Sequence, residues 1–184
     1  MFHQPSYLQV LGLLAAFCPR LPHLSLRSIT LDRATNPLRV LATCLPHLAT
    51  LAIKHLHVLG SRAGLLELAG LTSLTHLVLR PNCSKKTMDK LALVFTKLHL
   101  LRVVSVGFAS CLRSPHTRRH LALATFLPSL LAHNPGLEEV QLVQDHFCSV
   151  TVTAHHRALL GRRGVRLVQP CRDPAYDSSD EEGE

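Results

Sequence analysis

Aromatic side chains are scarce in this 184-residue chain, which has no tryptophan and only 4% aromatic residues. Proteins that bind single-stranded nucleic acid stack bases on such side chains, so the shortage argues against that class of function. A basic RNA- or chromatin-associated protein stays an alternative, because lysine and arginine form doublets at three places. These doublets are Lys85–Lys86, Arg118–Arg119 and Arg162–Arg163.

A long apolar run is also missing. A membrane-spanning helix needs about 18 or more apolar residues in succession, and no segment approaches that length. The apolar stretch LQVLGLLAAFC at residues 8–18 follows a segment without Lys or Arg, and no A-x-A cleavage site comes after it. We therefore expect neither a membrane span nor a secretory signal.

Sequence signatures of catalysis are absent as well: G-x-S-x-G, G-x-G-x-x-G and the phosphate-binding loop motif do not occur. The nearest approach to a metal site is Cys111, His116 and His120, but a second cysteine at a suitable spacing is missing. The sequence thus predicts no enzymatic activity, no cofactor and no metal site. A Ser–His or Cys–His pair that only folding would bring together stays an open alternative.

Six cysteines occur without any C-x-x-C pair, at Cys18, Cys44, Cys83, Cys111, Cys148 and Cys171. Cys18 and Cys44 lie near the ends of neighbouring expected helices, where a cysteine usually acts as a small buried apolar residue. We interpret the cysteines as reduced thiols of a cytoplasmic or nuclear protein, with a secreted disulfide scaffold as the alternative.

What the chain does contain is a leucine repeat. The stretch LTSLTHLVL places Leu71, Leu74, Leu77 and Leu79 in the pattern L-x-x-L-x-x-L-x-L. The pattern returns, in whole or in part, with repeat starts near residues 21, 48, 74, 101, 137 and 162, which are 27, 26, 27, 36 and 25 residues apart. In the last unit, Val165 and Leu167 take the two final positions. A near-constant period of this length is typical of repeat architectures.

Each unit combines one short strand with one helix. The L-x-L step has period two, so its apolar residues point to one face of a strand. Apolar residues at helical spacing lie between the strands, with Asn36 as a cap before Pro37 and with Thr153 as a second cap. Gly161 or Gly164 is expected to end the last helix. The expected helices fall within residues 4–17, 36–48, 84–98, 114–135 and 153–164.

These units predict an α/β leucine-rich-repeat solenoid, a horseshoe with short parallel strands on the concave face and helices on the convex face. The solenoid would occupy residues 1–170 with about six repeats. An ordinary doubly wound α/β domain is the alternative, but it does not account for the repeat period.

Charge divides the chain into two parts. Residues 1–170 hold 19 Lys and Arg against 6 Asp and Glu, a net +13, whereas residues 171–184 hold one Arg against six acids, a net −5. The second segment is acidic and lacks aliphatic residues, so we expect a disordered tail. Ser178 and Ser179 precede its acidic run and resemble sites of acidophilic kinases; a tail that only aids solubility is the alternative.

The strand alternation also predicts the side chains of the concave face. If Leu51 and Ile53 point into the core, then Thr50, Ala52 and Lys54 point outward. The corresponding residues of the other repeats are His23, Ser25 and Arg27; His76, Val78 and Arg80; Val103, Ser105 and Gly107; Glu139, Gln141 and Val143; and Gly164, Arg166 and Val168. Neighbouring parallel strands are about 4.8 Å apart.

Arg27, Lys54 and Arg80 should therefore form a row of three cations, with His23 and His76 on its rim. We expect this row to dock a protein partner with an acidic surface or peptide. The predicted partner-binding residues are His23, Arg27, Lys54, His76, Arg80, Glu139 and Gln141. Two alternatives stay open: the acidic tail folds back onto the row and competes with a partner, or the row is only a solvated surface.

The period, the segment CLPHLATLAI with Cys44 ahead of its leucines, and the cysteine-bearing helical connections resemble the repeats of F-box/leucine-rich-repeat proteins over most of residues 5–168. In that family an F-box docks on the Skp adaptor of a cullin ubiquitin ligase, and the repeats capture the substrate. The chain departs from the family because no F-box precedes the first repeat. The frequent Cys or Asn after each strand is also replaced, by Ser28, His55, Pro81 and Phe108.

The resemblance implies the substrate-recognition region of such a ligase subunit, as a fragment or short isoform whose link to the Skp adaptor would need the missing F-box. A free-standing leucine-rich-repeat adaptor or inhibitor without a role in ubiquitination is the alternative.

Overall fold

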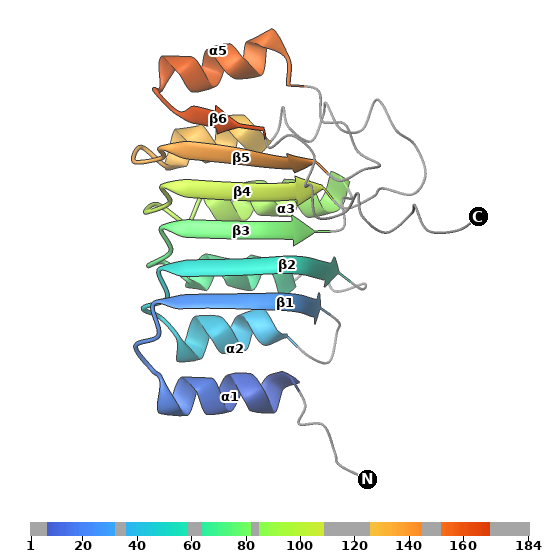
Figure 1. The fold of residues 1–184 in the computed structure, drawn as a ribbon, viewed down its shortest axis with the longest axis vertical. Helices are drawn as coiled ribbons and strands as arrows, with labels where there is room; N and C mark the ends of the chain where they lie inside the picture. The colour runs from blue at the N-terminus through green and yellow to red at the C-terminus, as the bar shows by residue number, and fades with distance from the viewer. Residues whose placement is uncertain are drawn as a thin grey trace, which may run out of the picture.

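The computed structural model describes residues 7–31, 36–58, 64–81, 85–108, 126–144 and 152–169. Its centre is one sheet of six strands, and the strands follow one another in the order of the sequence (Figure 1). Every neighbouring pair is parallel. The strands are β1 (His23–Leu31), β2 (Thr50–Val58), β3 (His76–Pro81), β4 (Val103–Phe108), β5 (Glu139–Gln144) and β6 (Arg166–Val168).

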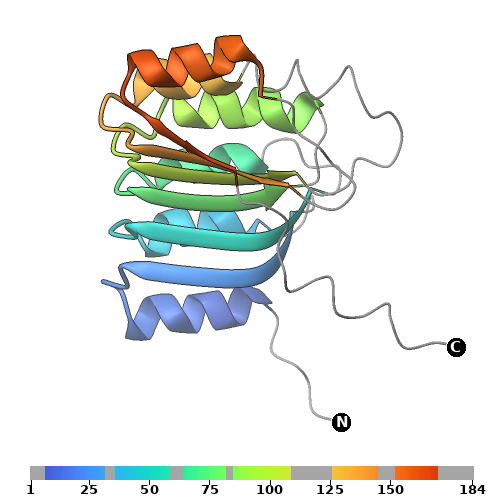
Figure 2. The ribbon, with the colours of Figure 1, turned by 45° about the horizontal axis from the view of Figure 1, so that its top comes forward.

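One helix precedes the first strand, helical segments connect the later strands, and these helical segments lie on one side of the sheet (Figure 2). They are α1 (Tyr7–Phe17), α2 (Pro37–Cys44), the 3-10 helix η1 (Gly64–Gly70), α3 (Lys85–Phe95), the helical residues 126–133, and α5 (Ala154–Arg162). Parallel strands require such crossover connections, because a tight turn can join only antiparallel strands. The chain is therefore an α/β protein with an all-parallel sheet. None of the described helices is both long and apolar enough to cross a membrane.

A recurring pair of backbone hydrogen bonds joins each of the first four units to the next. The carbonyl of Pro22 accepts from the N–H groups of Ala49 and Thr50, each at 2.9 Å. The carbonyls of Ala49, Thr75 and Arg102 accept in the same way from the pairs Thr75 and His76, Arg102 and Val103, and Glu138 and Glu139. The accepting and donating residues are 27, 26, 27 and 36 positions apart, which are the first four spacings of the leucine repeat.

The last unit corrects the predicted register. The sequence pattern placed Gly164 beside Glu139, but the structure pairs Glu139 with Arg166 and Val140 with Leu167. The step is therefore 27 residues, not 25. The reason lies in the end of α5: Gly164 has a φ of 68°, and the N–H of Val165 bonds to the carbonyl of Leu160 at 3.0 Å. Because the N–H of Val165 takes part in closing the helix, Val165 does not belong to the strand, and β6 begins at Arg166.

The repeated leucines form the core between sheet and helices. The leucines of the stretch that begins at Leu71 are all 0% exposed, and the corresponding residues of the second and fourth repeats are at most 1% exposed. On α2 the predicted stripe is buried at Leu38 and Leu41, and on α3 the off-stripe Leu93 is 57% exposed. The first repeat is looser, because Leu21 and Leu26 are only partly buried.

One leucine position is taken by an asparagine. Asn134 follows the helical residues 126–133, where Leu45 and Leu71 stand in earlier repeats, and it is 1% exposed. Its Nδ2 donates to the carbonyl of Leu130 at 3.0 Å and to the carbonyl of Phe95 at 3.4 Å. These bonds satisfy the amide nitrogen, and one of the two partners belongs to the preceding repeat, whereas Oδ1 of Asn134 has no partner among the described residues.

The predicted helix boundaries are partly confirmed. Thr153 caps α5 in a capping box, in which its hydroxyl accepts from the N–H of His156 at 3.4 Å. Asn36 does precede Pro37 at the start of α2, but its side chain makes no capping hydrogen bond. Cys18 is exposed and Cys44 is half-buried, so the expectation that Cys18 is buried was wrong. Both are free thiols.

An apolar stripe is exposed on α1. Val10 is 41% exposed, Leu13 is 56% exposed and Phe17 is 81% exposed, and these residues lie on one side of the helix. Cys18 follows directly after this stripe, at the outer edge of the first unit.

Candidate functional site: a basic hollow on the open face of the sheet

None of the described helices covers the face of the sheet opposite the core, which we call the open face (Figure 2). Two rows of residues cross it in the register of the strands. The first row is His23, Thr50, His76, Val103, Glu139 and Arg166, and the second is Ser25, Ala52, Val78, Ser105, Gln141 and Val168. The first two predicted columns are therefore correct from β1 to β5.

The alternation of buried and exposed residues breaks in β2, and this changes the direction of the side chains that follow. In β2, Ile53 is buried, Lys54 and His55 are both exposed, and Leu56 is buried again. The register between β2 and β3 shifts at the same place. Such a β-bulge inserts one residue into one strand and turns two neighbouring side chains outward. β1 pairs continuously with β2 there and follows the same path, with both Arg27 and Ser28 exposed.

The bulge lies at the edge of a surface hollow with a volume of about 530 Å³. The hollow is lined by Ser25, Arg27, Lys54, His55 and Arg80, which come from three successive strands. The structure thus brings together the three cations of the predicted row. We call these five residues the basic hollow.

Sequence reasoning missed the contribution of Ser25 and His55 to this hollow. It also assigned Ser28 and His55 to positions after short strands, whereas β1 and β2 are nine residues long and contain both. The available signal was the spacing of three between Ile53 and Leu56, which repeats between Leu26 and Ile29. That spacing breaks the period of two and is typical of a bulge.

Gly107 determines how Arg80 lies across the open face. A Cβ atom built on Gly107 would be 2.6 Å from Cγ and 3.2 Å from Cδ of Arg80. The arginine stem therefore rests against the backbone of β4, in space that any larger residue would occupy. A glycine inside a strand often marks such a close approach.

The electrostatic environment of the hollow is one-sided. Strands β1 to β4 contain no Asp or Glu, and the described acids are Glu67, Asp89, Glu138 and Glu139. None of these four lies on a strand that lines the hollow. Within the described residues, Arg27, Lys54 and Arg80 form no ion pair, so no described carboxylate relieves the repulsion among them.

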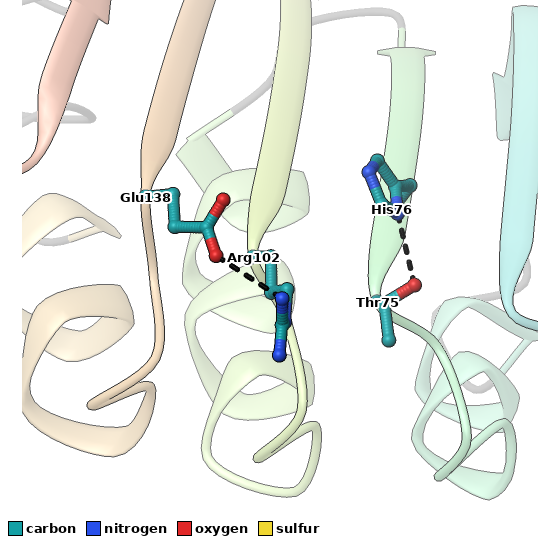
Figure 3. Close-up of polar contacts among 4 residues, drawn as sticks. All are labelled: Thr75, His76, Arg102 and Glu138. Carbon is teal, nitrogen blue, oxygen red and sulfur yellow. Dashed lines mark hydrogen bonds and ion pairs between the residues drawn. The ribbon is translucent and has the colours of Figure 1, made fainter.

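His76, which was expected on the rim of the cation row, lies in the first row of the open face and is not among the residues that line the basic hollow. Its ring has a defined orientation. The hydroxyl of Thr75 donates to the carbonyl of Ala49 at 3.1 Å, and the same oxygen is 2.9 Å from Nδ1 of His76 (Figure 3). A hydroxyl has a single hydrogen, so Nδ1 of His76 is the donor of the second bond. The other ring nitrogen of His76, Nε2, makes no part of this contact. His23 stands in the same row on β1 and is exposed.

The two predicted binding residues on β5 lie in a different setting. Glu139 Oε2 is 2.8 Å from an amino group of Arg166, and Glu139 Oε1 accepts from Nε2 of Gln141 at 2.5 Å. The Glu139 side chain is only 12% exposed, whereas that of Arg166 is 74% exposed. Glu139 and Gln141 are thus held by each other and by Arg166, away from the strands of the basic hollow.

A second ion pair lies at the beginnings of β4 and β5. Arg102 and Glu138 approach to 3.3 Å, and both side chains are more than 60% exposed (Figure 3). Exposed pairs of this kind contribute little to stability because water screens them.

Several predicted positions cannot be compared with the structure. Cys111, His116 and His120 lie outside the described residues, and so do Ser178, Ser179 and the whole segment 171–184. Cys83, Cys148 and Cys171 do too. Among the described residues, no three His, Cys, Asp or Glu side chains are grouped as metal ligands would be.

Comparison with known proteins adds no relative. No protein-family model matches the chain, and no curated protein or solved structure is significantly similar to it.

Proposed function

We propose that this protein is a non-enzymatic interaction module, a leucine-rich-repeat solenoid whose open face binds an acidic segment of a partner protein. The observation that carries the proposal is the basic hollow, where three cations from three strands converge without a carboxylate partner among the described residues. Unrelieved charge of one sign favours a partner of opposite charge and speeds its association.

The solenoid is supported by the agreement of two periods. The leucines and the interunit backbone hydrogen bonds share the spacings 27, 26, 27 and 36. Each unit contributes one strand and one helical connection, and neighbouring units share one core. Stacked repeats bury their apolar sides in this way because no single unit can bury its own.

The more specific proposal is the substrate-recognition region of an F-box/leucine-rich-repeat subunit of a cullin ubiquitin ligase, in the cytoplasm or nucleus. It is supported by the resemblance of the repeats to that family. A free-standing adaptor or inhibitor is the second candidate. An immunoprecipitate of the protein from cells that contains cullin and the Skp adaptor would favour the ligase, and one that contains neither would favour the free-standing adaptor.

The decisive experiment reverses the charge of the basic hollow. A variant with Arg27→Glu, Lys54→Glu and Arg80→Glu is compared with the wild-type protein in an affinity pull-down analysed by mass spectrometry. The matched control is Arg39→Glu, Lys97→Glu and Arg157→Glu, which changes the net charge equally at three exposed residues of the helices and their turns. Circular dichroism checks that both variants fold.

The expected result is that a defined partner binds the wild type and the control but not the hollow variant, with or without nuclease treatment. If the same partners bind all three proteins, the hollow is only a solvated surface. If nuclease removes the partners, the alternative of an RNA- or chromatin-associated protein is favoured instead.

The chain's own acidic segment is a candidate competitor for the same surface. Residues 171–184 carry a net charge of −5, opposite to the charge of the hollow. Deleting these residues should then strengthen binding of an acidic peptide, measured by fluorescence anisotropy. An unchanged affinity would leave the segment with no part in binding.

A further inference from the structure

The basic hollow has a shape and composition that a general acidic surface does not require. Its cations come from three adjacent strands, β1, β2 and β3, and neighbouring strands are about 4.8 Å apart. The three charged groups therefore surround one place and do not follow a long track. Two of them are arginines, whose planar forks bind tetrahedral or planar oxyanions through two parallel hydrogen bonds.

Two further polar groups face the same place. The hydroxyl of Ser25 and the imidazole of His55 line the hollow together with the cations. The bulge in β2 is the reason that His55 faces outward beside Lys54, because without the extra residue the alternation would point His55 into the core. The hollow thus offers hydrogen-bond donors of four chemical kinds on several sides of one space.

We propose that the basic hollow is a binding site for a phosphoryl monoester, the phosphorylated serine or threonine of the acidic partner. This group carries a charge of about −1.5 to −2 near pH 7 and three strong acceptor oxygens, and so it matches several convergent cations better than a single carboxylate does. The inference rests on the proposed function, since it specifies what the partner presents to the open face.

The distribution of charge and aromatic residues favours a phosphorylated protein over nucleic acid. A nucleic-acid strand carries one charge per phosphodiester and needs a basic groove along several nucleotides, usually with aromatic side chains for stacking. Here the cations are confined to β1, β2 and β3, and these strands contain no Phe, Tyr or Trp. The volume of about 530 Å³ exceeds the size of one phosphoryl group and leaves room for the residues that flank it.

Gly107 takes part in this site as a positioning residue. Because it has no side chain, the stem of Arg80 can lie against the backbone of β4. Gly107→Ala would displace the arginine while leaving every charge in place. Gly136 offers the matched control, because an added Cβ there would meet nothing within 4 Å.

The test uses short glycine-rich peptides that carry one phosphoserine, one glutamate or one unmodified serine, together with an all-glutamate peptide and an oligothymidylate. Binding to the full-length protein is followed by amide chemical shifts in NMR at about pH 7.5, above the second pKa of the phosphoryl group near 6. The phosphoserine peptide should bind about tenfold more tightly than the glutamate peptide. The largest shifts should come from Ser25, Lys54 and His55.

Two variants distinguish the contribution of the paired hydrogen bonds of the arginines from the contribution of their charge. The double variant Arg27→Lys and Arg80→Lys keeps the charge but removes the forks, so the preference for phosphoserine should fall about threefold or more. Binding of the all-glutamate peptide should change less than about twofold, because a point charge is enough for it. Gly107→Ala should also lower the preference for phosphoserine, whereas Gly136→Ala should not.

Equal affinity for the phosphoserine and glutamate peptides would overturn the phosphoryl site but leave the proposed acidic-partner function intact. Equal affinity for the oligothymidylate and the phosphoserine peptide would overturn the assignment to a phosphorylated protein. If the wild-type protein binds the phosphoserine peptide but not the all-glutamate peptide, the proposal that the open face binds an acidic segment in general would be contradicted. If Gly107→Ala does not fold, the arginine-to-lysine variant still decides the question.

Discussion

The two ends of the open face are built from the same kind of parallel strands, but they differ in whether their charged side chains form ion pairs. At the β1–β3 end, Arg27 and Lys54 are exposed and pair with no described acid. At the β5–β6 end, Glu139 is nearly buried and is held by Arg166 and Gln141. The difference teaches that strand position alone does not make a polar residue available to a partner, because a neighbouring strand can already satisfy it.

The largest effect should come from the core, where the two ends are alike. Leu51 on β2 is 0% exposed and Leu142 on β5 is 2% exposed. Leu51→Ala and Leu142→Ala should each lower the free energy of unfolding by about 2–5 kcal/mol, through lost burial and the cavity left behind. Urea denaturation followed by circular dichroism measures both.

Leu93→Ala, at a residue that is 57% exposed, serves as the control for this pair and should change the unfolding free energy by less than about 0.5 kcal/mol. A small effect at only one of the two core positions would show that the repeats at that end are packed differently.

At the paired end, removal of a cation should destabilise the protein. Arg166→Gln leaves the nearly buried carboxylate of Glu139 with Gln141 as its remaining described partner. We expect a loss of about 1 kcal/mol, because water around the exposed arginine already screens part of the pair. Arg157→Gln on the exposed side of α5 is the control. Equal unfolding midpoints for the two variants would contradict the importance of the pair.

At the unpaired end, removal of a cation should have the opposite sign. Lys54→Gln relieves repulsion from the neighbouring arginines, so the free energy of unfolding should rise by about 0.2–0.5 kcal/mol at low salt. The gain should vanish at about 1 M salt, where the Debye length is about 3 Å. Parallel urea titrations at the two salt concentrations test this, and a loss of stability at low salt would show that the lysine has a hidden partner.

The smallest effect is expected at the exposed pair of Arg102 and Glu138. Arg102→Gln should change the free energy of unfolding by less than about 0.5 kcal/mol, because both side chains are largely in water. A double-mutant cycle with Glu138→Gln measures the coupling between them. A coupling above about 1 kcal/mol would mean that this exposed pair stabilises the protein as much as the pair of Glu139 and Arg166 does, against the expectation.

Much of the sheet could be predicted from the leucine period, because the L-x-L alternation and the spacing of the repeats follow from burial on one face. The correct columns from β1 to β5 and the convergence of Arg27, Lys54 and Arg80 are examples.

The register of the last strand could not be predicted from the same pattern. Val165 and Leu167 fit the alternation of Val140 and Leu142, and a shift by two residues preserves which face each residue occupies. Only the way that α5 ends at Gly164 distinguishes the two registers. For the same reason the ion pair of Glu139 and Arg166 was not predicted, since the predicted register placed Gly164, and not Arg166, beside Glu139.

The sequence by itself determined the α/β pattern, the period of the units, the buried leucines and the placement of three cations on one face, because these depend on local periodicity. Only the tertiary structure decided that His55 lines the hollow with the three cations, that the stem of Arg80 lies against Gly107, and that Glu139 pairs with Arg166. Each of these depends on contacts between strands whose paired residues are about 25 to 27 positions apart in the sequence, and local periodicity does not specify such contacts.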